Sequence, residues 1–151
     1  MLELARDIDR VDVNRLARQV HELHVSWRPD IYCMPEELFP EHAFAELIAR
    51  REIYVAKLEN RIVGYVTVKT RTYDWPAVVY RRVMLIDQIC VDEAFRGHGF
   101  GTQMMEEIRI LAKAFGCTDL QMGVYPQNDA AVSFYQKCGF MIRSIDMQIK
   151  V

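Results

Sequence analysis

The sequence predicts a single-domain α+β fold, and three observations support this prediction. Runs of strand character alternate with stretches of helical periodicity in the order βαα-βββ-αβ-αβ. With 151 residues, the chain is long enough to bury most of its apolar surface without a metal or a disulfide. No repeat, linker or low-complexity run divides residues 1–151, so one domain is the simplest interpretation.

Four segments have the periodicity of helices. The clearest runs from Gly99 to Phe115, where apolar residues recur every three or four positions and Gly116 provides a stop. An amphipathic helix is also expected from Asp12 to near Pro29, because proline disfavours continuation of the helix. The remaining two helices are expected from about Glu41 and over Asn128 to Cys138.

Six segments are rich in β-branched and other apolar residues, as strands are. Two of them, Ile53 to Leu58 and Ile62 to Thr70, flank Glu59-Asn60-Arg61, whose asparagine suits a hairpin turn. An exposed connection is expected over Arg71 to Ala77. The other four strands are expected over Leu2 to Ile8, Val78 to Val91, Leu120 to Val124 and Phe140 to Val151.

Composition and charge argue against several classes of protein. The formal net charge of -2 at pH 7 disfavours nucleic-acid binding, which usually requires a basic excess. The N-terminus lacks the pattern of a signal peptide, and no apolar stretch reaches the roughly 18–20 residues of a membrane span. The 4 cysteines form no CxxC pair, and His21 and His24 lack a third ligand, so we expect reduced thiols and no metal. These features indicate a cytoplasmic protein that binds neither nucleic acid nor membrane.

The segment Arg96-Gly97-His98-Gly99-Phe100-Gly101 lies between a predicted strand and the clearest predicted helix. Glycines permit close approach of a ligand, and the free N–H groups and dipole of a helix start attract anions. The spacing differs from that of a Walker loop and from the GxGxxG of a dinucleotide fingerprint. From the residues alone, a phosphate-binding turn and a glycine-rich helix start without a ligand both remain open.

Two blocks of sequence together resemble one family, the GNAT superfamily of N-acetyltransferases. The first block resembles motif A, whose core signature is (Q/R)xxGx(G/A), through Ile89, Val91, Arg96, Gly99 and Gly101. The second block, from Tyr125 to Phe140, resembles motif B through Asn128, Ala131, Tyr135, Gly139 and Phe140. The resemblance covers about residues 58–140. It implies a mixed, mostly antiparallel sheet of roughly six to seven strands, splayed where acetyl-CoA binds, with about four helices.

The resemblance implies that acetyl-CoA is the cosubstrate and that no metal takes part. The pyrophosphate would lie on backbone N–H groups of the glycine segment, and the pantetheine arm would fill the gap between the splayed strands. A backbone N–H near Cys90 would polarise the thioester carbonyl. Asn128 matches a residue that commonly contacts the cofactor, although its position equally suits a helix N-cap. The implied cofactor-binding residues are Ile89, Cys90, Val91, Arg96, Gly97, His98, Gly99, Phe100, Gly101, Thr102 and Asn128.

The resemblance also supplies two catalytic candidates. Tyr135 matches the family tyrosine near the thioester sulfur, where its hydroxyl would act as general acid; its alternative role is that of a core aromatic. Asp87, two residues before Ile89 on the same predicted strand, is the candidate base that deprotonates the amine. A water chain is the alternative to Asp87, and a bulge in the strand would turn this side chain away.

The acceptor is expected to bind among residues 9–52, and residues 53–140 are expected to form the acetyl-CoA-binding core. Trp27 and Tyr32 are candidates to stack on a cationic amine, and Asp30 is a candidate to attract one. The same loop equally suits aromatics that are anchored in the core. The expected reaction is direct attack of a primary amine, from a small molecule or a peptide, in a ternary complex.

Two further alternatives remain open from the sequence. A catalytically silent relative would bind acetyl-CoA as a sensor or interaction module. Tyr73, Trp75 and Tyr80 suit either a pocket wall or the contact surface of a homodimer.

Overall fold

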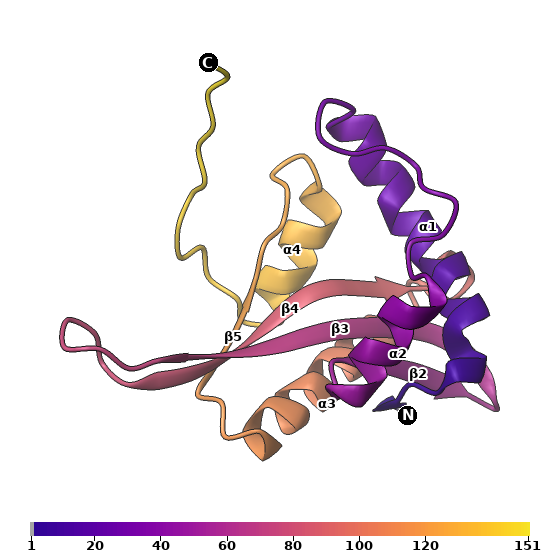
Figure 1. Ribbon diagram of the computed structural model, residues 1–151, viewed down its shortest axis with the longest axis horizontal. Coiled ribbons are helices and arrows are strands. Elements are labelled where there is room, and N and C mark those ends of the chain that lie inside the picture. Colours follow the sequence, from indigo (N-terminus) through magenta and orange to yellow (C-terminus); the bar gives the residue numbers. More distant parts are fainter. Residues whose placement is uncertain (1) are drawn as a thin grey trace.

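The computed structural model describes residues 2–151, and one five-stranded sheet lies at its centre. The strands lie side by side in their order along the chain (Figure 1). They are β1 (Leu2–Leu4), β2 (Ile53–Leu58), β3 (Arg61–Tyr73), β4 (Arg81–Val91) and β5 (Asp119–Met122). Neighbours from β1 to β4 are antiparallel, whereas β4 and β5 are parallel. The sheet is therefore mixed and mostly antiparallel, as the sequence predicts.

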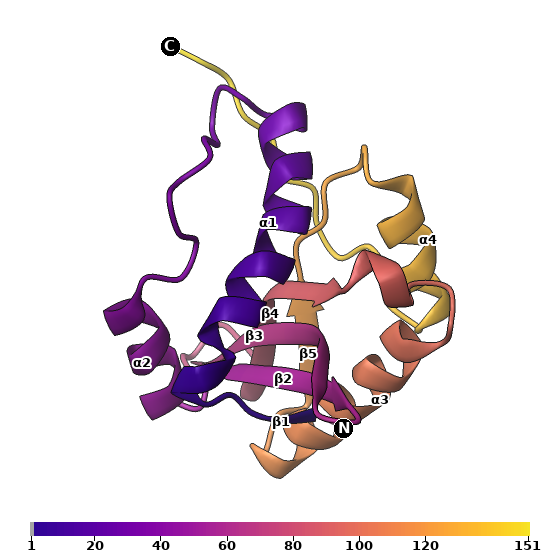
Figure 2. The same cartoon turned by 90° about the vertical axis from the view of Figure 1, so that its right-hand side faces the viewer.

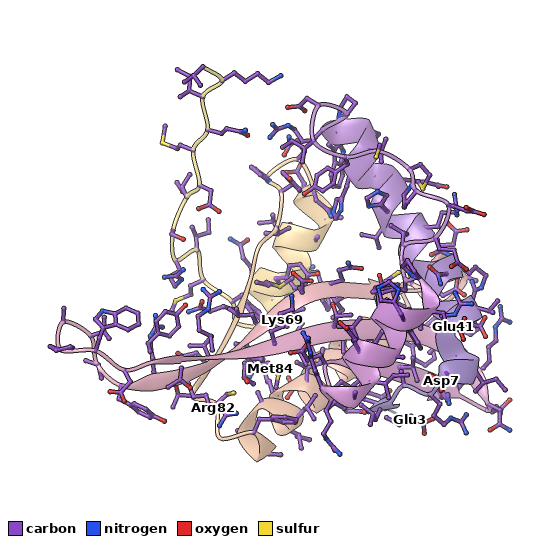
Figure 3. The ribbon with its side chains drawn as sticks, in the orientation of Figure 1. Glu3, Asp7, Glu41, Lys69, Arg82 and Met84 are labelled. Atoms are coloured by element: carbon purple, nitrogen blue, oxygen red, sulfur yellow. The ribbon has the colours of Figure 1, made fainter. Side chains whose placement is uncertain are left out.

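Helices cover both faces of the sheet, with α1 and α2 on one face and α3 and α4 on the other (Figure 2). α1 (Arg10–Trp27) and α2 (Glu41–Ala49) share a buried cluster with β2, β3 and β4 that includes Leu16, Phe44 and Tyr65. On the opposite face lie α3 (Phe100–Ala114) and α4 (Asp129–Lys137). There Ile108 of α3 belongs to a second buried cluster together with Met84 of β4. Met84 is labelled in Figure 3. This arrangement confirms the α+β class.

The prediction of six to seven strands is wrong, because residues 140–151 form no strand. Residues 141–151 leave the end of α4 as an exposed, extended segment (Figure 1). Their alternating apolar and polar side chains give the segment strand propensity, but a strand also needs a hydrogen-bonded neighbour. Within residues 2–151 the segment has no such neighbour.

β3 and β4 project beyond the rest of the sheet as a two-stranded ribbon (Figure 1). The sequence predicts an exposed connection from Arg71, but pairing continues as far as Tyr73 opposite Arg81. The Arg81 guanidinium lies 4.8 Å from the centre of the Tyr73 ring, which stabilises the ribbon near its tip. Trp75, Val79 and Tyr80 are exposed at that tip.

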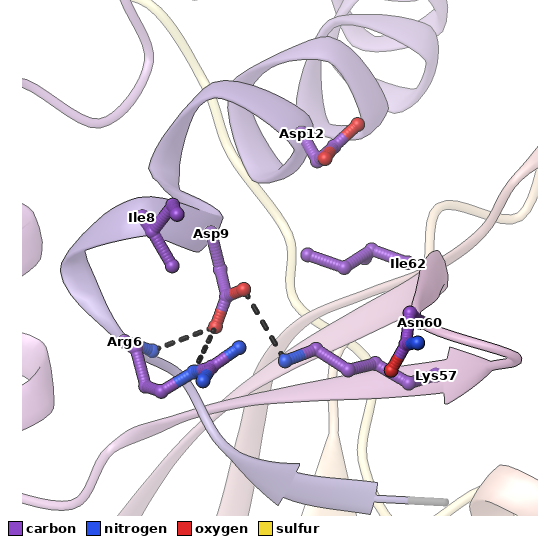
Figure 4. Close-up of a pocket in the computed structure, with 7 residues that line it drawn as sticks. All are labelled: Arg6, Ile8, Asp9, Asp12, Lys57, Asn60 and Ile62. Atoms are coloured by element: carbon purple, nitrogen blue, oxygen red, sulfur yellow. Dashed lines mark hydrogen bonds and ion pairs between the residues drawn. The ribbon is translucent and has the colours of Figure 1, made fainter.

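An ion pair between Asp9 and Lys57 joins the segment before α1 to β2 (Figure 4). The buried carboxylate of Asp9, in a 3-10 helix before α1, accepts a hydrogen bond from the backbone N–H of Arg6 at 2.8 Å. It also lies 3.3 Å from Nζ of Lys57 on β2. In this surface hollow Arg6 and Lys57 both pair with Asp9, and Asp12 pairs with the nearby Arg15, so we assign the hollow a structural role.

Asp92 joins α1 to the end of β4. Its carboxylate is 2% exposed and accepts hydrogen bonds from Arg15 at 2.9 Å, from Gln19 at 3.3 Å and from the N–H of Ala94 at 3.2 Å. Burial opposes ionisation of Asp92, but these hydrogen bonds favour it more strongly and hold its pKa below the ordinary value. The anchor fixes α1 at the point where the chain enters the glycine segment.

Gly64 allows β3, β4 and α3 to approach one another closely. It lies opposite Val91 in the β3–β4 pairing. A Cβ atom at this position would lie 2.7 Å from the carbonyl oxygen of Cys90 and 2.7 Å from Sδ of Met104. Because the first of these atoms belongs to the backbone, a side chain here would displace the end of β4.

We therefore expect Gly64→Ala to lower the free energy of unfolding by about 1–3 kcal/mol through overpacking. Gly123→Ala is the matched control, because a Cβ at Gly123 meets no atom within 4 Å. The control should change stability by less than about 0.5 kcal/mol. Urea unfolding of both variants measures the difference, and equal losses would contradict the role given to Gly64.

Asp92 should stabilise the fold only while it is ionised. Its pKa is lower in the folded protein than the value of about 3.9 expected for the unfolded chain. Its contribution is therefore fully present above that pH and is lost as the pH falls through the folded pKa. At neutral pH, Asp92→Asn should cost about 1–3 kcal/mol. Urea unfolding at decreasing pH should show the gap between variant and wild type closing below about pH 4, and a constant gap would refute this account.

Candidate active site

β4 separates from its parallel neighbour halfway along its length. It pairs with β5 only from Val83 to Ile86, whereas it pairs with β3 from Arg81 to Val91. Within the described part of the chain, the edge of β4 over residues 87–91 therefore has no strand on the β5 side. An extended ligand can bind the N–H and C=O groups of such an edge as an added strand would. This edge contains three of the predicted cofactor-binding residues, Ile89, Cys90 and Val91.

The turn from β4 into α3 exposes free backbone N–H groups. Gly97 and Gly99 adopt φ angles of 78° and 85°, which side chains disfavour, and Gly99 is the N-cap of α3. The first backbone hydrogen bond of the helix is donated by Gln103 to the Gly99 carbonyl, so the N–H groups before it have no intrahelical acceptor. These groups lie at the positive end of the helix dipole and form an anion site at the end of the free β4 edge.

The Arg96 side chain folds back and stabilises this turn through hydrogen bonds. Its Nε donates to the carbonyl oxygen of Val91 at 3.0 Å, and its Nη2 donates to Gln19 of α1 at 3.4 Å. Nδ1 of His98 lies 2.9 Å from the carbonyl oxygen of Arg96. Arg96 therefore fixes the turn against β4 and α1, and it still adds a permanent positive charge beside the free N–H groups.

α4 closes the other side of the gap. Its N-cap is Asn128, whose Oδ1 accepts a hydrogen bond from the N–H of Ala131 at 3.2 Å. The capping role that the sequence offered for Asn128 is thus confirmed. Phe134 packs against the start of α3, where a Cβ at Gly101 would lie 3.2 Å from its ring. This contact holds α4 directly beside the anion site.

Tyr135 lies on α4 between Phe134 and Phe140, whose ring centres are 5.3 and 5.9 Å from its own. Burial raises the pKa of its hydroxyl to about 12, and the nearby Cys138 and Cys90 thiols add to this effect. Tyr135 packs against the same buried cluster as Ile89, which lies on the free edge of β4. The hydroxyl is protonated at neutral pH and can donate a hydrogen bond to a ligand in the gap.

Cys90 is 3% exposed, and its Sγ lies 3.5 Å from the carbonyl oxygen of Leu16 in α1. Burial raises the pKa of the thiol to about 11, although the guanidinium of Arg96 partly offsets this effect. The side chain therefore belongs to the core between the sheet and α1, while the backbone of the same residue lies on the free edge of β4.

Asp87 is the extra residue of a β-bulge. Adjacent residues of β3 lie opposite Gln88 and Ile86, which leaves Asp87 without a partner. Because a bulge interrupts the alternation of side chains, a position two residues before Ile89 does not by itself place Asp87 on the same face. Asp87 is exposed, and its charge adds to the burial that raises the pKa of Tyr65.

An aromatic cluster of His24, Trp27, Tyr32 and Tyr125 spans the space between α1 and the loop that joins β5 to α4. The hydroxyls of Tyr32 and Tyr125 lie 2.7 Å apart. The ring centre of His24 lies 5.4 Å from that of Tyr32, 5.7 Å from that of Tyr125 and 5.9 Å from that of Trp27. Burial lowers the pKa of His24, as does the neighbouring His21, so the imidazole is neutral at neutral pH.

Two of the three residues predicted to bind the acceptor, Trp27 and Tyr32, belong to this cluster. The third, Asp30, forms an ion pair with Arg28 instead. Its carboxylate accepts hydrogen bonds from Nε and Nη2 of Arg28 at 2.9 and 2.7 Å. These hydrogen bonds lower the pKa of Asp30 to about 2. Arg28 also donates to Gln148 of the exposed C-terminal segment at 3.1 Å.

Sequence reasoning gave no site role to Tyr125, His24 or Gln19. Tyr125 had a usable signal, because it follows β5 closely and so lies at the end of the sheet where the strands separate. His24 and Gln19 lie on α1, and only the packing of that helix against the strand ends reveals them.

Within residues 2–151, no three His, Cys, Asp or Glu side chains gather as a potential metal site. Across the same residues, every helix is too short or too polar to cross a lipid bilayer.

Known proteins resemble this chain in both sequence and fold. It is 32% identical over 102 residues to the uncharacterized N-acetyltransferase YvbK of Bacillus subtilis, a match that spans 67% of this chain and 60% of YvbK. The crystal structure of a tetramutant of the BH1408 protein from Bacillus halodurans is 28% identical, with a TM-score of 0.93 over 100% of this chain and 99% of that one. The aminoglycoside N-acetyltransferase AAC(6')-Iy, solved in complex with CoA, shares the fold at 14% identity and a TM-score of 0.70, with 100% of each chain covered.

A profile of one family matches most of the chain, over residues 17–140, and this match includes both blocks that carry the resemblance in sequence. The profile is that of the acetyltransferase (GNAT) family. The five-stranded mixed sheet, with its separated β4 and β5 and a glycine-rich start to α3, agrees with that match. The chain therefore belongs to the acetyltransferase (GNAT) family.

Proposed function

We propose that this protein is an N-acetyltransferase that uses acetyl-CoA to acetylate a primary amine. The observation that carries the proposal is the free edge of β4 that leads to the N-terminus of α3. Together they offer hydrogen-bond partners to an extended ligand and an anion site to its phosphates. Membership of the family supports this function, as does the CoA complex of AAC(6')-Iy, which shares the fold.

The residues around the gap fit acetyl-CoA. We assign the pyrophosphate to the backbone N–H groups of residues 96–102 and the pantetheine arm to the edge formed by Ile89, Cys90 and Val91. Asn128 retains its amide nitrogen for the cofactor after its oxygen caps α4. Bound acetyl-CoA would supply the acetyl group as a thioester, whose carbonyl we assign to the N–H groups near Cys90.

Tyr135 assists the departure of the CoA thiolate, which is the leaving group of the reaction. Its pKa of about 12 lies above the value near 8.5 of a thiol, so complete proton transfer to the sulfur is uphill by about 5 kcal/mol. A hydrogen bond from the hydroxyl nevertheless stabilises the negative charge that develops on the sulfur as the C–S bond breaks. Tyr135 therefore acts mainly as a hydrogen-bond donor.

The amine must lose a proton for its nitrogen to form the new bond to the carbonyl carbon. Asp87 is exposed on the bulge and is the first residue of the free β4 edge, so we assign it as the base, directly or through a water chain. The neutral imidazole of His24 is a second group on the acceptor side that can accept a proton.

The acceptor enters from the side of residues 9–52, where the aromatic cluster forms the wall. Trp27 and Tyr32 offer ring faces that attract a cationic or planar amine. Asp30 contributes a negative charge that Arg28 largely neutralises, so it orders the loop more than it attracts a cation. These features suit an amine carried by a small molecule or by a peptide.

Tyr135→Phe should lower kcat by about a hundredfold, because the leaving sulfur loses its hydrogen bond, while affinity for CoA and stability stay unchanged. Tyr54→Phe is the matched control, since Tyr54 is also buried but lies on β2. Thiol release from acetyl-CoA, measured over a panel of amines, gives the rates. If no amine supports turnover by the wild type while acetyl-CoA binds, the protein is a sensor and the proposed reaction is wrong.

Gly99→Asp should weaken CoA binding by placing a negative charge on the proposed phosphate path, at a cost of about 2 kcal/mol, or roughly thirtyfold in Kd. Gly99→Asn has nearly the same shape and also tolerates a positive φ, so it separates charge from backbone strain. A Cβ at Gly99 meets no atom of the protein within 4 Å, so both variants should fold. Calorimetric titration with CoA tests this; equal affinities of the two variants would place the pyrophosphate elsewhere.

A further inference from the structure

The ribbon formed by the projecting ends of β3 and β4 carries an excess of positive charge. Residues 69–82 contain one carboxylate, that of Asp74, and four cationic side chains, although the whole chain has a net charge of -2. The four cations are Lys69, Arg71, Arg81 and Arg82. The overall charge of the chain therefore conceals a local basic surface.

The cations of the ribbon are available to a partner. Within residues 2–151, none of the four forms an ion pair with a carboxylate. Lys69 and Arg71 are exposed. Arg81 stacks on the face of the Tyr73 ring, a contact that does not use the hydrogen-bond donors of its guanidinium. Unpaired cations on a projecting surface attract an external anion.

The tip of the ribbon, beyond these cations, is uncharged and mostly apolar. It consists of the run Trp75-Pro76-Ala77-Val78-Val79-Tyr80. Three of its large side chains are 50%, 84% and 63% exposed, namely Trp75, Val79 and Tyr80. Aliphatic side chains gain free energy when they leave water, and Trp and Tyr favour the interface between a membrane and water. The tip therefore suits the headgroup layer of a lipid bilayer.

The order of the two surfaces along the ribbon matches the layers of a membrane surface. The pair Lys69–Leu85 lies four residue pairs behind the pair Tyr73–Arg81, so the cations occupy about 13 Å of ribbon behind the tip. The headgroup layer of one leaflet is roughly 5–8 Å thick. When the tip enters this layer, the nearest cations reach the lipid phosphates. The farthest cations stay within the Debye length of about 10 Å at 0.1 M salt.

The shape of the ribbon favours a membrane over a nucleic acid. Figure 1 shows that the ribbon projects beyond the helices, so a broad, flat partner can reach its tip. Lys69 and Arg82, labelled in Figure 3, belong to opposite faces of the ribbon, because Arg82 opposes Thr72 and side chains alternate along a strand. Lipid headgroups can surround both faces. The aliphatic centre of the tip, by contrast, offers no hydrogen bonds to bases.

We propose that the tip of the β3–β4 ribbon docks this protein on the surface of membranes that contain anionic lipids. Trp75, Val79 and Tyr80 enter the headgroup layer, and the four cations pair with the lipid phosphates around them. The contact is reversible and needs no membrane-spanning helix. It revises the expectation, drawn from the whole sequence, that the protein binds no membrane. The docking goes beyond the proposed acetyl transfer and does not depend on it.

Co-sedimentation with vesicles tests the docking. The wild type should bind vesicles of phosphatidylcholine and phosphatidylglycerol in a ratio of about 7:3, and it should bind pure phosphatidylcholine at least about tenfold more weakly. Lys69→Gln/Arg71→Gln should lower the partition coefficient about fivefold for each cation removed. Trp75→Ser/Val79→Ser should lower it at least about tenfold, because the tip loses its apolar side chains.

Two variants of α3 are the matched controls. Lys113→Gln removes a cation from an exposed position, and Ile110→Ser removes an aliphatic side chain that is 67% exposed. Both controls should bind anionic vesicles as the wild type does, and all four variants should keep the circular dichroism of the wild type. Absence of wild-type binding to anionic vesicles, or equal losses in the ribbon variants and the controls, would overturn the proposal.

The fluorescence of Trp75 tests the depth of the contact. The chain has 2 tryptophans, so Trp27→Phe leaves Trp75 as the only one. Anionic vesicles should shift its emission to shorter wavelength, and lipids with brominated acyl chains should quench it. Unchanged emission on bound vesicles would contradict insertion of the tip. Ribbon variants that lose binding to a DNA duplex, or self-association, while the wild type ignores vesicles would assign the ribbon to that other partner.

Discussion

The divided pairing of β4 is the constraint on which the rest of the structure depends. One edge of β4 bonds to β3 throughout, and the other loses β5 after Ile86. Backbone groups without a strand need another partner, so the opening determines where an extended ligand can bind. Two residues stabilise this arrangement. Gly64 allows close packing at the end of β4, and Asp92 bonds α1 to the same strand end.

The site combines groups that burial has made neutral with backbone groups that remain polar. Tyr135 and His24 both have pKa values shifted away from ionisation at neutral pH, mainly by burial. The positive charge comes instead from the α3 N-terminus and from Arg96, which the turn holds in place. A site built in this way discriminates by geometry, because its hydrogen-bond donors are fixed by the backbone before a ligand arrives.

Local signals explain what the sequence could predict. The spacing of apolar residues located α3, and the glycines located its free N-terminus. Asn128 was recognisable as a helix cap. Each of these features depends on residues that are close together in the sequence. The bulge at Asp87 could not be predicted from such local signals, because it depends on the register between β3 and β4. The aromatic cluster was likewise hidden, because it brings Tyr125 to α1 across about a hundred residues of sequence. Residues 141–151 show the same limit, since strand propensity is local and a strand partner is not.

Cys90 has a consequence for the selectivity of the proposed chemistry. A thioester bound along the β4 edge, as we propose, would lie beside the backbone of Cys90, and an ionised thiol that reached it would displace CoA and take the acetyl group. With a pKa of about 11, only about one in ten thousand of these thiols is ionised at neutral pH. Contact with Leu16 also keeps the sulfur turned into the core. In the proposed reaction, the burial of Cys90 would therefore keep its sulfur from taking the acetyl group, which would stay available for the amine.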